Sequence, residues 1–339
     1  MRGNRRARAP AWLPACVGWH LLATLTVKVS FIVPLYNCLP LTQAMVTSLQ
    51  ATVPRGVAYE VILVDDGSTD GTRNWLAALV PPFRVVLNDR NYGYAGANNR
   101  GAAVAAGEVL VLLNNDLVLT RSWLEPMLRA RERLGARAGA IGNVQRRVDT
   151  GEIDHAGVSI NLKAKPEHDT DLAPRWWRKV QPLRRTPAVT GACALIDRNL
   201  WTKLGGFDEG FLNGGEDVDF CFRARQLGRV NAVAWESVIW HHISASPGRK
   251  LRDEQNSRRL ALRWRSELEH LAARRWCWDY LFRQWTTAHD ALDYGAASQA
   301  LFYGLHLRRT VPSIAAAGMR EAMNRELIRW ESLLAAAEN

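Results

Sequence analysis

Cysteine is scarce in this chain of 339 residues, and the five cysteines present follow no recognisable spacing. They are odd in number, scattered and without a CxxC pair: Cys16, Cys38, Cys193, Cys221 and Cys277. This pattern argues against a disulfide framework and against a structural zinc site. It favours a reducing compartment, so we expect a cytoplasmic protein.

Several ligand-binding signatures are also missing. No GxxxxGK[ST] loop occurs, and no GxGxxG follows the first predicted strand, which disfavours a P-loop and a dinucleotide site. The formal net charge of +11 favours an anionic partner, such as nucleic acid, anionic lipid or a phosphorylated substrate. Because no RNA-binding or zinc-finger signature accompanies the charge, nucleic acid is the least favoured of the three.

Long apolar runs are absent apart from residues 11–27, which follow four arginines. Pro14 and His20 interrupt that run, so it is too broken for a spanning helix, and no clear cleavage site for a signal peptide follows. We expect residues 1–27 to be an extension of uncertain order, with a peripheral membrane contact as one role.

The remaining sequence alternates between apolar β-branched runs and helical patterns. This alternation predicts the α/β class with a mostly parallel, doubly wound sheet. Residues 141–187 are less regular, and 161–187 predict a long excursion or a mobile loop; the pattern from residue 251 onward is helical. The expected domains are 28–250 and a helical C-terminal extension, 251–339. The expected strands are 29–33, 59–64, 83–87, 109–113, 188–196 and 230–240, and the expected helices are 41–50, from 72, 95–106, 121–134 and 215–227.

Polar residues follow each of the first four predicted strands. Because the carboxyl ends of parallel strands meet at one edge of a sheet, these residues should converge there. An aromatic ring, carboxylates, glycines and a helix N-terminus suit a nucleotide diphosphate with a cation. The converging segments are Pro34-Leu35-Tyr36-Asn37, Asp65-Asp66-Gly67-Ser68, the glycine- and asparagine-rich 91–101, and Asn114-Asn115-Asp116.

Six segments in order resemble the family-2 glycosyltransferases, and most of all the bacterial rhamnosyltransferase-like branch. They cover about residues 28–246: VSFIVPLYN, VILVDDGSTDGT, NYGYAGANNRG, VLLNND, VTGACALIDRNLWTKLGGFDEGFLNGGEDVDFCFRARQLG and VIWHHISAS. The resemblance implies the GT-A nucleotide-sugar fold and an inverting transfer of a sugar from a nucleotide-diphosphate donor.

The resemblance also implies roles for individual residues. In the family, Asp217 of the Glu216-Asp217 pair corresponds to the general base, although acidic residues are also favoured in any first helical turn. Asp116 takes the last position of the DxD metal motif and binds Mg²⁺ or Mn²⁺, with His242 favoured over His241 as a second ligand. The donor-binding residues are expected to be Pro34, Tyr36, Asn37, Asp65, Asp66, Asn99 and Asn115.

The expected partners are a UDP, dTDP or GDP sugar and a hydroxyl acceptor. The acceptor is expected to be a cell-envelope glycan or a lipid-linked saccharide at the inner face of the plasma membrane. The alternative is a non-catalytic nucleotide- or glycan-binding module on the same fold. A sugar nucleotidyltransferase is less favoured, because no glycine-rich basic activation motif lies near the first strand.

Overall fold

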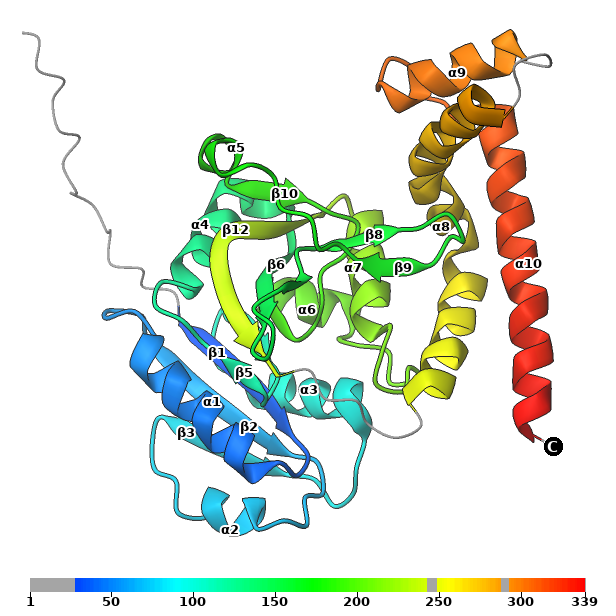
Figure 1. The fold of residues 1–339 in the computed structure, drawn as a ribbon. Coiled ribbons are helices and arrows are strands. Elements are labelled where there is room, and N and C mark those ends of the chain that lie inside the picture. Colours follow the sequence, from blue (N-terminus) through cyan, green and yellow to red (C-terminus); the bar gives the residue numbers. More distant parts are fainter. Residues whose placement is uncertain (1–27, 243–248, 288–292, 339) are drawn as a thin grey trace, which may run out of the picture.

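The computed structural model describes residues 28–242, 249–287 and 293–338, and Figure 1 shows their arrangement. The predictions for residues 1–27 lie outside the described residues. The chain forms an α/β fold in which helices cover both faces of one large sheet, and three C-terminal helices pack beside it. The predicted fold class is thereby confirmed.

The large sheet is mixed and has ten strands. Its main order is β10-β12-β6-β11-β4-β1-β2-β3, with β5 on β12 and β7 on β6. Strands β1 to β4 are parallel, as predicted, but β11 runs antiparallel between β4 and β6. The strands are β1 (Val29–Leu35), β2 (Tyr59–Asp65), β3 (Phe83–Leu87), β4 (Val109–Leu113), β5 (Leu117–Val118), β6 (Ala138–Arg147), β7 (Ile153–His155), β10 (Leu183–Arg185), β11 (Cys193–Asp197) and β12 (Val230–His241).

The five individually predicted helices lie close to their predicted limits, whereas the helices at Arg175–Val180 and Arg198–Leu204 were not predicted. Those of the sheet-bearing part are α1 (Leu39–Thr52), α2 (Thr72–Leu76), α3 (Gly93–Val104), α4 (Leu124–Leu134), α5 (Arg175–Val180), α6 (Arg198–Leu204) and α7 (Glu216–Gln226), with a 3₁₀ turn at Gly135–Arg137. The C-terminal helices are α8 (Arg249–Thr287), α9 (Tyr294–Gly304) and α10 (Ser313–Glu338).

Strand β1 shows how the sheet is buried on both faces. Its alternate residues Phe31 and Val33 join the apolar cluster of α1 and α4, whereas Ile32 joins the cluster of α3 and α7. Side chains of a strand point alternately to the two faces, so an uninterrupted apolar run is what a doubly covered strand requires.

Helix α3 approaches the sheet closely because Gly101 has no side chain. A Cβ at this position would lie 2.5 Å from Cγ2 of Ile32 and 3.0 Å from Cγ2 of Val64. This close approach brings the N-terminus of α3 to the carboxyl ends of β1 and β2.

The predicted excursion contains short regular elements. A two-stranded sheet forms from β8 (Val158–Ile160) and β9 (Pro166–His168), and α5 and β10 follow. The pattern was missed because strands of three residues are too short to show a period.

The C-terminal helices share the apolar cluster of the sheet-bearing part. Trp264 and Trp330 are buried in it, whereas Trp285 is 81% exposed at the far end of α8. Within the described ranges, no helix has both the length and the apolar character needed to cross a membrane.

Candidate active site

The first predicted carboxylate, Asp65, is fully buried at the end of β2. Its Oδ2 accepts a hydrogen bond from Nε of Arg73 at 2.7 Å, and its Oδ1 accepts one from the backbone N–H of Ser68 at 3.2 Å. Both carboxylate oxygens therefore have protein partners that fix the loop between β2 and α2.

The neighbouring carboxylate, Asp66, is bound to the N-terminus of α3. It accepts hydrogen bonds from the backbone N–H groups of Tyr92 and Gly93 and from Nδ2 of Asn88, at 2.7 to 3.0 Å. A negative charge at this point also interacts favourably with the helix dipole. Asp66 thus anchors α3, and its role in binding a base stays a prediction.

The loop after β1 is joined to the loop after β2. The backbone N–H of Asn37 donates to Oγ of Ser68 at 2.8 Å, and Oδ1 of Asn37 accepts from the N–H of Thr69 at 2.8 Å. Pro34 lies opposite Val64 in the sheet register. Tyr36 is 53% exposed, so its ring is open to a ligand.

The side chain of Asn99 binds the loop before α7 and does not point into an open site. Its Oδ1 accepts from the N–H of Phe207 at 2.9 Å, and its Nδ2 donates to the carbonyl of Phe207 and to Oε1 of Glu209, both at 3.0 Å. The donor-binding role expected for Asn99 stays a prediction.

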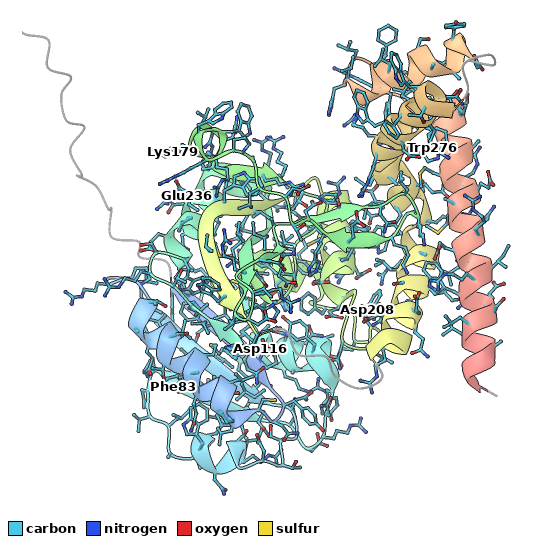
Figure 2. All side chains as sticks on the ribbon, in the orientation of Figure 1. Phe83, Asp116, Lys179, Asp208, Glu236 and Trp276 are labelled. Carbon is cyan, nitrogen blue, oxygen red and sulfur yellow. The ribbon has the colours of Figure 1, made fainter. Side chains whose placement is uncertain are left out.

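The pairing of β5 with the end of β12 brings Asp116 to the tandem histidines. Because Leu117 lies opposite His241, Oδ1 of Asp116 is 3.3 Å from Nε2 of His241. Nδ1 of the same ring is 3.6 Å from Oδ2 of Asp154, which lies in β7. His242 contacts Asp116 through its backbone, donating its N–H to the carbonyl oxygen at 3.0 Å. Figure 2 shows Asp116 near the centre of the molecule.

The two amides before Asp116 have different surroundings. Nδ2 of Asn115 donates to Oγ1 of Thr42 at 3.0 Å, which directs Asn115 toward α1. Among the described residues, Oδ1 of Asn114 is buried without a hydrogen-bond partner, whereas Oδ1 of Asp116 is buried beside the His241 ring and forms an ion pair with it. Buried polar oxygens without a partner are rare and point to a missing ligand or water.

The donors around Asp116 form only an incomplete set of ligands for a metal ion. Among the residues that the structure describes, no group of three or more His, Cys, Asp and Glu side chains is arranged to hold one. Mg²⁺ in enzymes is commonly bound by one or two carboxylates together with substrate phosphates. The residues therefore fit a cation that arrives with a diphosphate and binds Asp116, and they do not form a complete cage.

Electrostatics at this end of the site favour a charged histidine. Burial opposes the charged form of His241, but the carboxylates of Asp116 and Asp154 outweigh burial and raise its pKa to about 9. The imidazolium is thus a positive charge at neutral pH, and a metal that used this ring as a ligand would first have to displace its proton.

The acidic pair lies at the beginning of α7. Oδ2 of Asp217 accepts from the N–H of Gly191 at 2.8 Å, Oδ1 accepts from the N–H of Val218 at 2.8 Å, and Oε2 of Glu216 accepts from the N–H of Gly214 at 2.7 Å. Burial and the neighbouring Asp217 raise the pKa of Glu216 to about 8, and burial raises the pKa of Asp217. Two adjacent acids, one buried and one half-buried, share protons, so the pair can hold one proton near neutral pH.

Tyr94 also belongs to this region, although no role was predicted for it. Its hydroxyl donates to the carbonyl oxygen of Gly191 at 2.7 Å, while Asp217 accepts the N–H of the same residue. Burial raises the pKa of Tyr94 well above its usual value. Tyr94 and Gly191 both lie in segments that carry the family resemblance, NYGYAGANNRG and VTGACALID, and these segments were the available signal for the contact.

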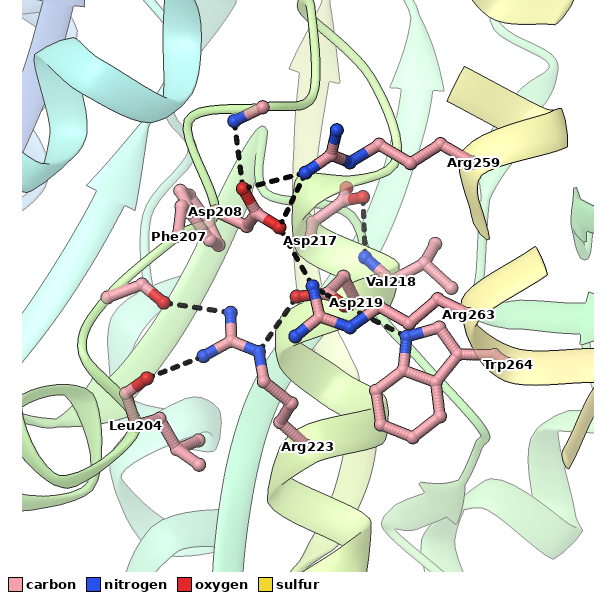
Figure 3. A network of polar contacts seen from close by, with 12 residues as sticks. Leu204, Phe207, Asp208, Asp217, Val218, Asp219, Arg223, Arg259, Arg263 and Trp264 are labelled. Carbon is pink, nitrogen blue, oxygen red and sulfur yellow. Dashed lines mark hydrogen bonds and ion pairs between the residues drawn. The ribbon is translucent and has the colours of Figure 1, made fainter. Parts of the chain in front are cut away.

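A buried network of ion pairs links α7 to α8, as Figure 3 shows. The carboxylate of Asp219 is fully buried and accepts hydrogen bonds from Nε of Arg223 at 2.7 Å and from Nε1 of Trp264 at 2.8 Å. A guanidinium nitrogen of Arg263 lies 3.2 Å from Asp219 and 2.8 Å from Asp208. Arg263 thereby joins the two carboxylates.

The same network reaches the loop before α7. Arg223 donates to the carbonyls of Leu204 and Gly206 at 2.7 and 2.8 Å. Arg259 of α8 pairs with Asp208 at 3.1 Å, and Figure 2 shows Asp208 beside the first half of α8. Asp208 therefore fixes the loop before α7 to α8.

The mixed sheet covered by helices on both faces, with polar residues at the carboxyl ends of its parallel strands, defines a GT-A glycosyltransferase fold. Residues 30–200, just over half of the chain, match the model of Glycosyl transferase family 2. The chain belongs to this family, as the resemblance predicted.

Three curated relatives illustrate the range of the family. The chain is 31% identical over 278 residues to uncharacterized protein y4gI of Sinorhizobium fredii, covering 79% of this chain and 28% of that protein. It is 35% identical over 236 residues to O-antigen biosynthesis protein RfbC of Myxococcus xanthus, covering 65% and 18%. The N-acetylglucosaminyl-diphospho-decaprenol L-rhamnosyltransferase of Mycobacterium tuberculosis is 29% identical, with 63% and 76% covered. The chain thus spans less than a third of the first two relatives.

Two solved structures share the fold. GalNAc-T7 with UDP, GalNAc and Mn²⁺ aligns with a TM-score of 0.61 at 18% identity, covering 85% of this chain and 59% of that chain. The mannosyltransferase PcManGT of Pyrobaculum calidifontis, in complex with GDP-Man and Mn²⁺, aligns with a TM-score of 0.55 at 22% identity, covering 90% and 86%.

The Asp219→Ala variant should be strongly destabilised, because it leaves the charge of Arg223 and the indole N–H of Trp264 without their buried partner. We expect a loss of about 3–5 kcal/mol in the free energy of unfolding, measured by urea denaturation. Arg259→Ala is the control, since it removes a partly exposed ion pair worth at most about 1 kcal/mol. Equal losses in the two variants would contradict the importance of the buried carboxylate.

Proposed function

We propose that the chain is an inverting, metal-dependent glycosyltransferase. It transfers a sugar from a nucleotide diphosphate to a hydroxyl group of a cell-envelope glycan or a lipid-linked saccharide. The observation that carries this proposal is the acidic pair of buried Glu216 and half-buried Asp217, on the same molecule as the Asp116–His241 ion pair. The O-antigen and decaprenol-linked activities in the relatives' names support the acceptor class.

Binding of the donor is assigned to the edge formed by the ends of β1, β2 and β4. Tyr36 offers an exposed ring for the base, and Asp65 lies at the adjoining strand end. The further donor contacts that we propose come from the residues around this edge: Pro34, Asn37, Asp66, Asn99 and Asn115. A UDP, dTDP or GDP sugar fits this assignment.

In the proposed reaction, Asp217 accepts the proton of the acceptor hydroxyl. The acceptor oxygen forms a bond to the anomeric carbon from the face opposite the diphosphate, and the bond from that carbon to the diphosphate oxygen breaks. Glu216, whose pKa is raised to about 8, keeps its proton near neutral pH and leaves Asp217 as the ionised partner. Such a base contributes typically about 10²–10⁴-fold to the rate.

The leaving diphosphate carries the developing negative charge. Mg²⁺ or Mn²⁺ held by Asp116 would stabilise this charge when bound. His241 already places an imidazolium beside Asp116, and His242 remains the ligand favoured from the sequence. The positive charges that we propose for the leaving diphosphate are therefore a metal ion bound by Asp116 and the imidazolium of His241.

We further propose a peripheral contact with the inner face of the plasma membrane through the far end of α8 and α9. Trp285 and Phe282 are exposed on one stripe of α8. Trp278 continues this stripe against α9, since a Cβ at Gly304 would lie 2.9 Å from its ring. Exposed aromatic side chains with neighbouring arginines suit an anionic lipid surface. The exposed residues that complete this aromatic end are Leu301, Phe302, Leu305 and Leu307, and Arg308 and Arg309 follow them.

The Asp217→Asn variant should lose transfer by about 10²–10⁴-fold while it still binds the donor, because the amide keeps the shape but cannot accept the proton. Transfer is measured with purified protein and a lipid-linked acceptor, and donor binding by thermal shift. Glu236→Gln, an exposed acid on β12, is the control that should keep full activity. Unchanged transfer by Asp217→Asn would refute the base, and donor binding without any transfer by the unmodified protein would favour the non-catalytic module.

The apparent melting temperature should rise with one class of nucleotide sugar when Mn²⁺ is present. A ligand at 100 times its Kd stabilises the folded state by about 2.7 kcal/mol. Asp116→Ala should abolish the metal-dependent part of this rise, Asn114→Ala should only reduce it, and a comparison of His241→Ala with His242→Ala identifies the histidine ligand. A rise that is the same with and without Mn²⁺, or that survives Asp116→Ala, would contradict the metal assignment.

The protein should pellet with vesicles of phosphatidylglycerol in a co-sedimentation assay, and a much smaller fraction should pellet with vesicles of phosphatidylcholine. The double variant Phe282→Ala, Trp285→Ala should bind at least about tenfold more weakly, since burying one such side chain contributes roughly 1.5–3 kcal/mol. The control is Trp176→Ala, Trp177→Ala, which removes another exposed aromatic pair, on α5. If only the control variant lost vesicle binding, the membrane contact would lie on α5, and the proposal would be wrong.

A further inference from the structure

The loop at residues 211–215 leads directly into the acidic pair. It is bound by a residue of the C-terminal helix α8, and both the loop and this helix lie beyond residues 30–200, which match the family model. Asn256 of α8 is only 5% exposed and faces this loop. Its Oδ1 accepts the N–H of Leu212 at 3.0 Å, and its Nδ2 donates to the carbonyl oxygen of the same residue at 3.0 Å. One side-chain amide therefore satisfies both polar groups of one backbone residue.

This double hydrogen bond is a main anchor of the loop at that point. The side chain of Leu212 is 54% exposed, so burial of apolar surface contributes little there. Gly214 and Gly215 follow with φ angles of 155° and 91°, in a region that side chains rarely adopt. A segment with two such glycines has little conformational preference of its own, so its shape depends on external contacts.

Two neighbours of Leu212 connect the loop to the site. Oδ1 of Asn213 accepts the N–H of Tyr94 in the first turn of α3 at 2.7 Å. The N–H of Gly214 donates to Oε2 of Glu216 at 2.7 Å. A shift of the backbone at residue 212 would therefore displace a cap of α3 and a hydrogen bond to the acidic pair together.

We propose that Asn256 is a positioning residue that fixes the 211–215 loop and, through this loop, the Glu216-Asp217 pair of the proposed transferase. The inference rests on the proposed function for its catalytic consequence. Asn256 acts through the backbone of Leu212 and touches neither acid itself in this arrangement. It gives the C-terminal helix α8 a part in the reaction, in addition to its packing.

The Asn256→Ala variant should lose about 10²-fold in kcat, the scale of a misplacement of about 1 Å at a reacting group, with the donor KM unchanged. Loss of the Gly214 N–H contact disfavours the ionised form of Glu216. The ionisation of Glu216 in the pH–rate profile should therefore move to higher pH while the acid limb set by Asp217 stays in place, a pattern that destabilisation alone would not produce. Hydrogen exchange of the amides at residues 212 and 214 should accelerate in the same variant.

Two further variants make the test decisive. Asn256→Asp keeps the acceptor for the Leu212 N–H but loses the donor, so its kcat should lie between those of the unmodified protein and Asn256→Ala. Asn324→Ala removes one exposed hydrogen bond between α8 and α10 and should change neither kcat nor the profile. If Asn256→Ala unfolds, Asn256→Asp carries the comparison.

The outcomes separate this inference from the proposed function. An active protein whose Asn256 variants keep their kcat and pH profile would overturn the positioning role. If the unmodified protein transfers no sugar from any donor, the proposed function fails, and the exchange rates at residues 212 and 214 still decide whether Asn256 holds the loop. If hydrogen exchange at residues 212 and 214 were unchanged in Asn256→Ala, the role of Asn256 in holding the loop would also be refuted.

Discussion

The fully buried carboxylate of Asp219 is the interaction on which the arrangement of this molecule depends. An ionised carboxylate in an apolar interior is tolerated only with charged and hydrogen-bonded partners. One partner, Arg223, lies on the same helix, but Trp264 and Arg263 come from α8. Helix α7 begins with the acidic pair, and its buried carboxylate Asp219 has all of these partners only when α8 packs against α7. The backbone of Trp264 departs from helical geometry at this contact, with φ of −117° and ψ of 23°.

The two ends of the proposed site have opposite electrostatic character. At one end, burial and the neighbouring Asp217 raise the pKa of Glu216 to about 8, so that in the proposed reaction Glu216 holds a proton and leaves Asp217 ionised as the base. At the other end, Asp116 and Asp154 raise the pKa of His241 to about 9, which keeps a positive charge. A transfer that removes a proton from an acceptor and expels a diphosphate needs a base at one end and a cation at the other.

The elements of the fold were largely predictable, and the contacts of the site were not. The predicted strand 83–87 coincides with β3, because a short apolar run is a local property. The reversed direction of β11 is set by pairing with strands far away in the sequence, so no local pattern indicates it. Likewise Asp66 and Asn99 bind partners 26 and 108 positions away. Their types suggested a polar site, but only the folded chain shows that they anchor α3 and the loop before α7.

The tandem histidines show where the limit of sequence reasoning lies. Successive residues of a strand point to opposite faces, so only one of two adjacent histidines can turn its ring toward a given neighbour. Which one does so depends on the register between β12 and β5, and that register places His241 opposite Leu117. A shift of one residue would exchange the two rings. The resemblance favoured His242, whose backbone N–H reaches Asp116, while the imidazole beside the carboxylate belongs to His241.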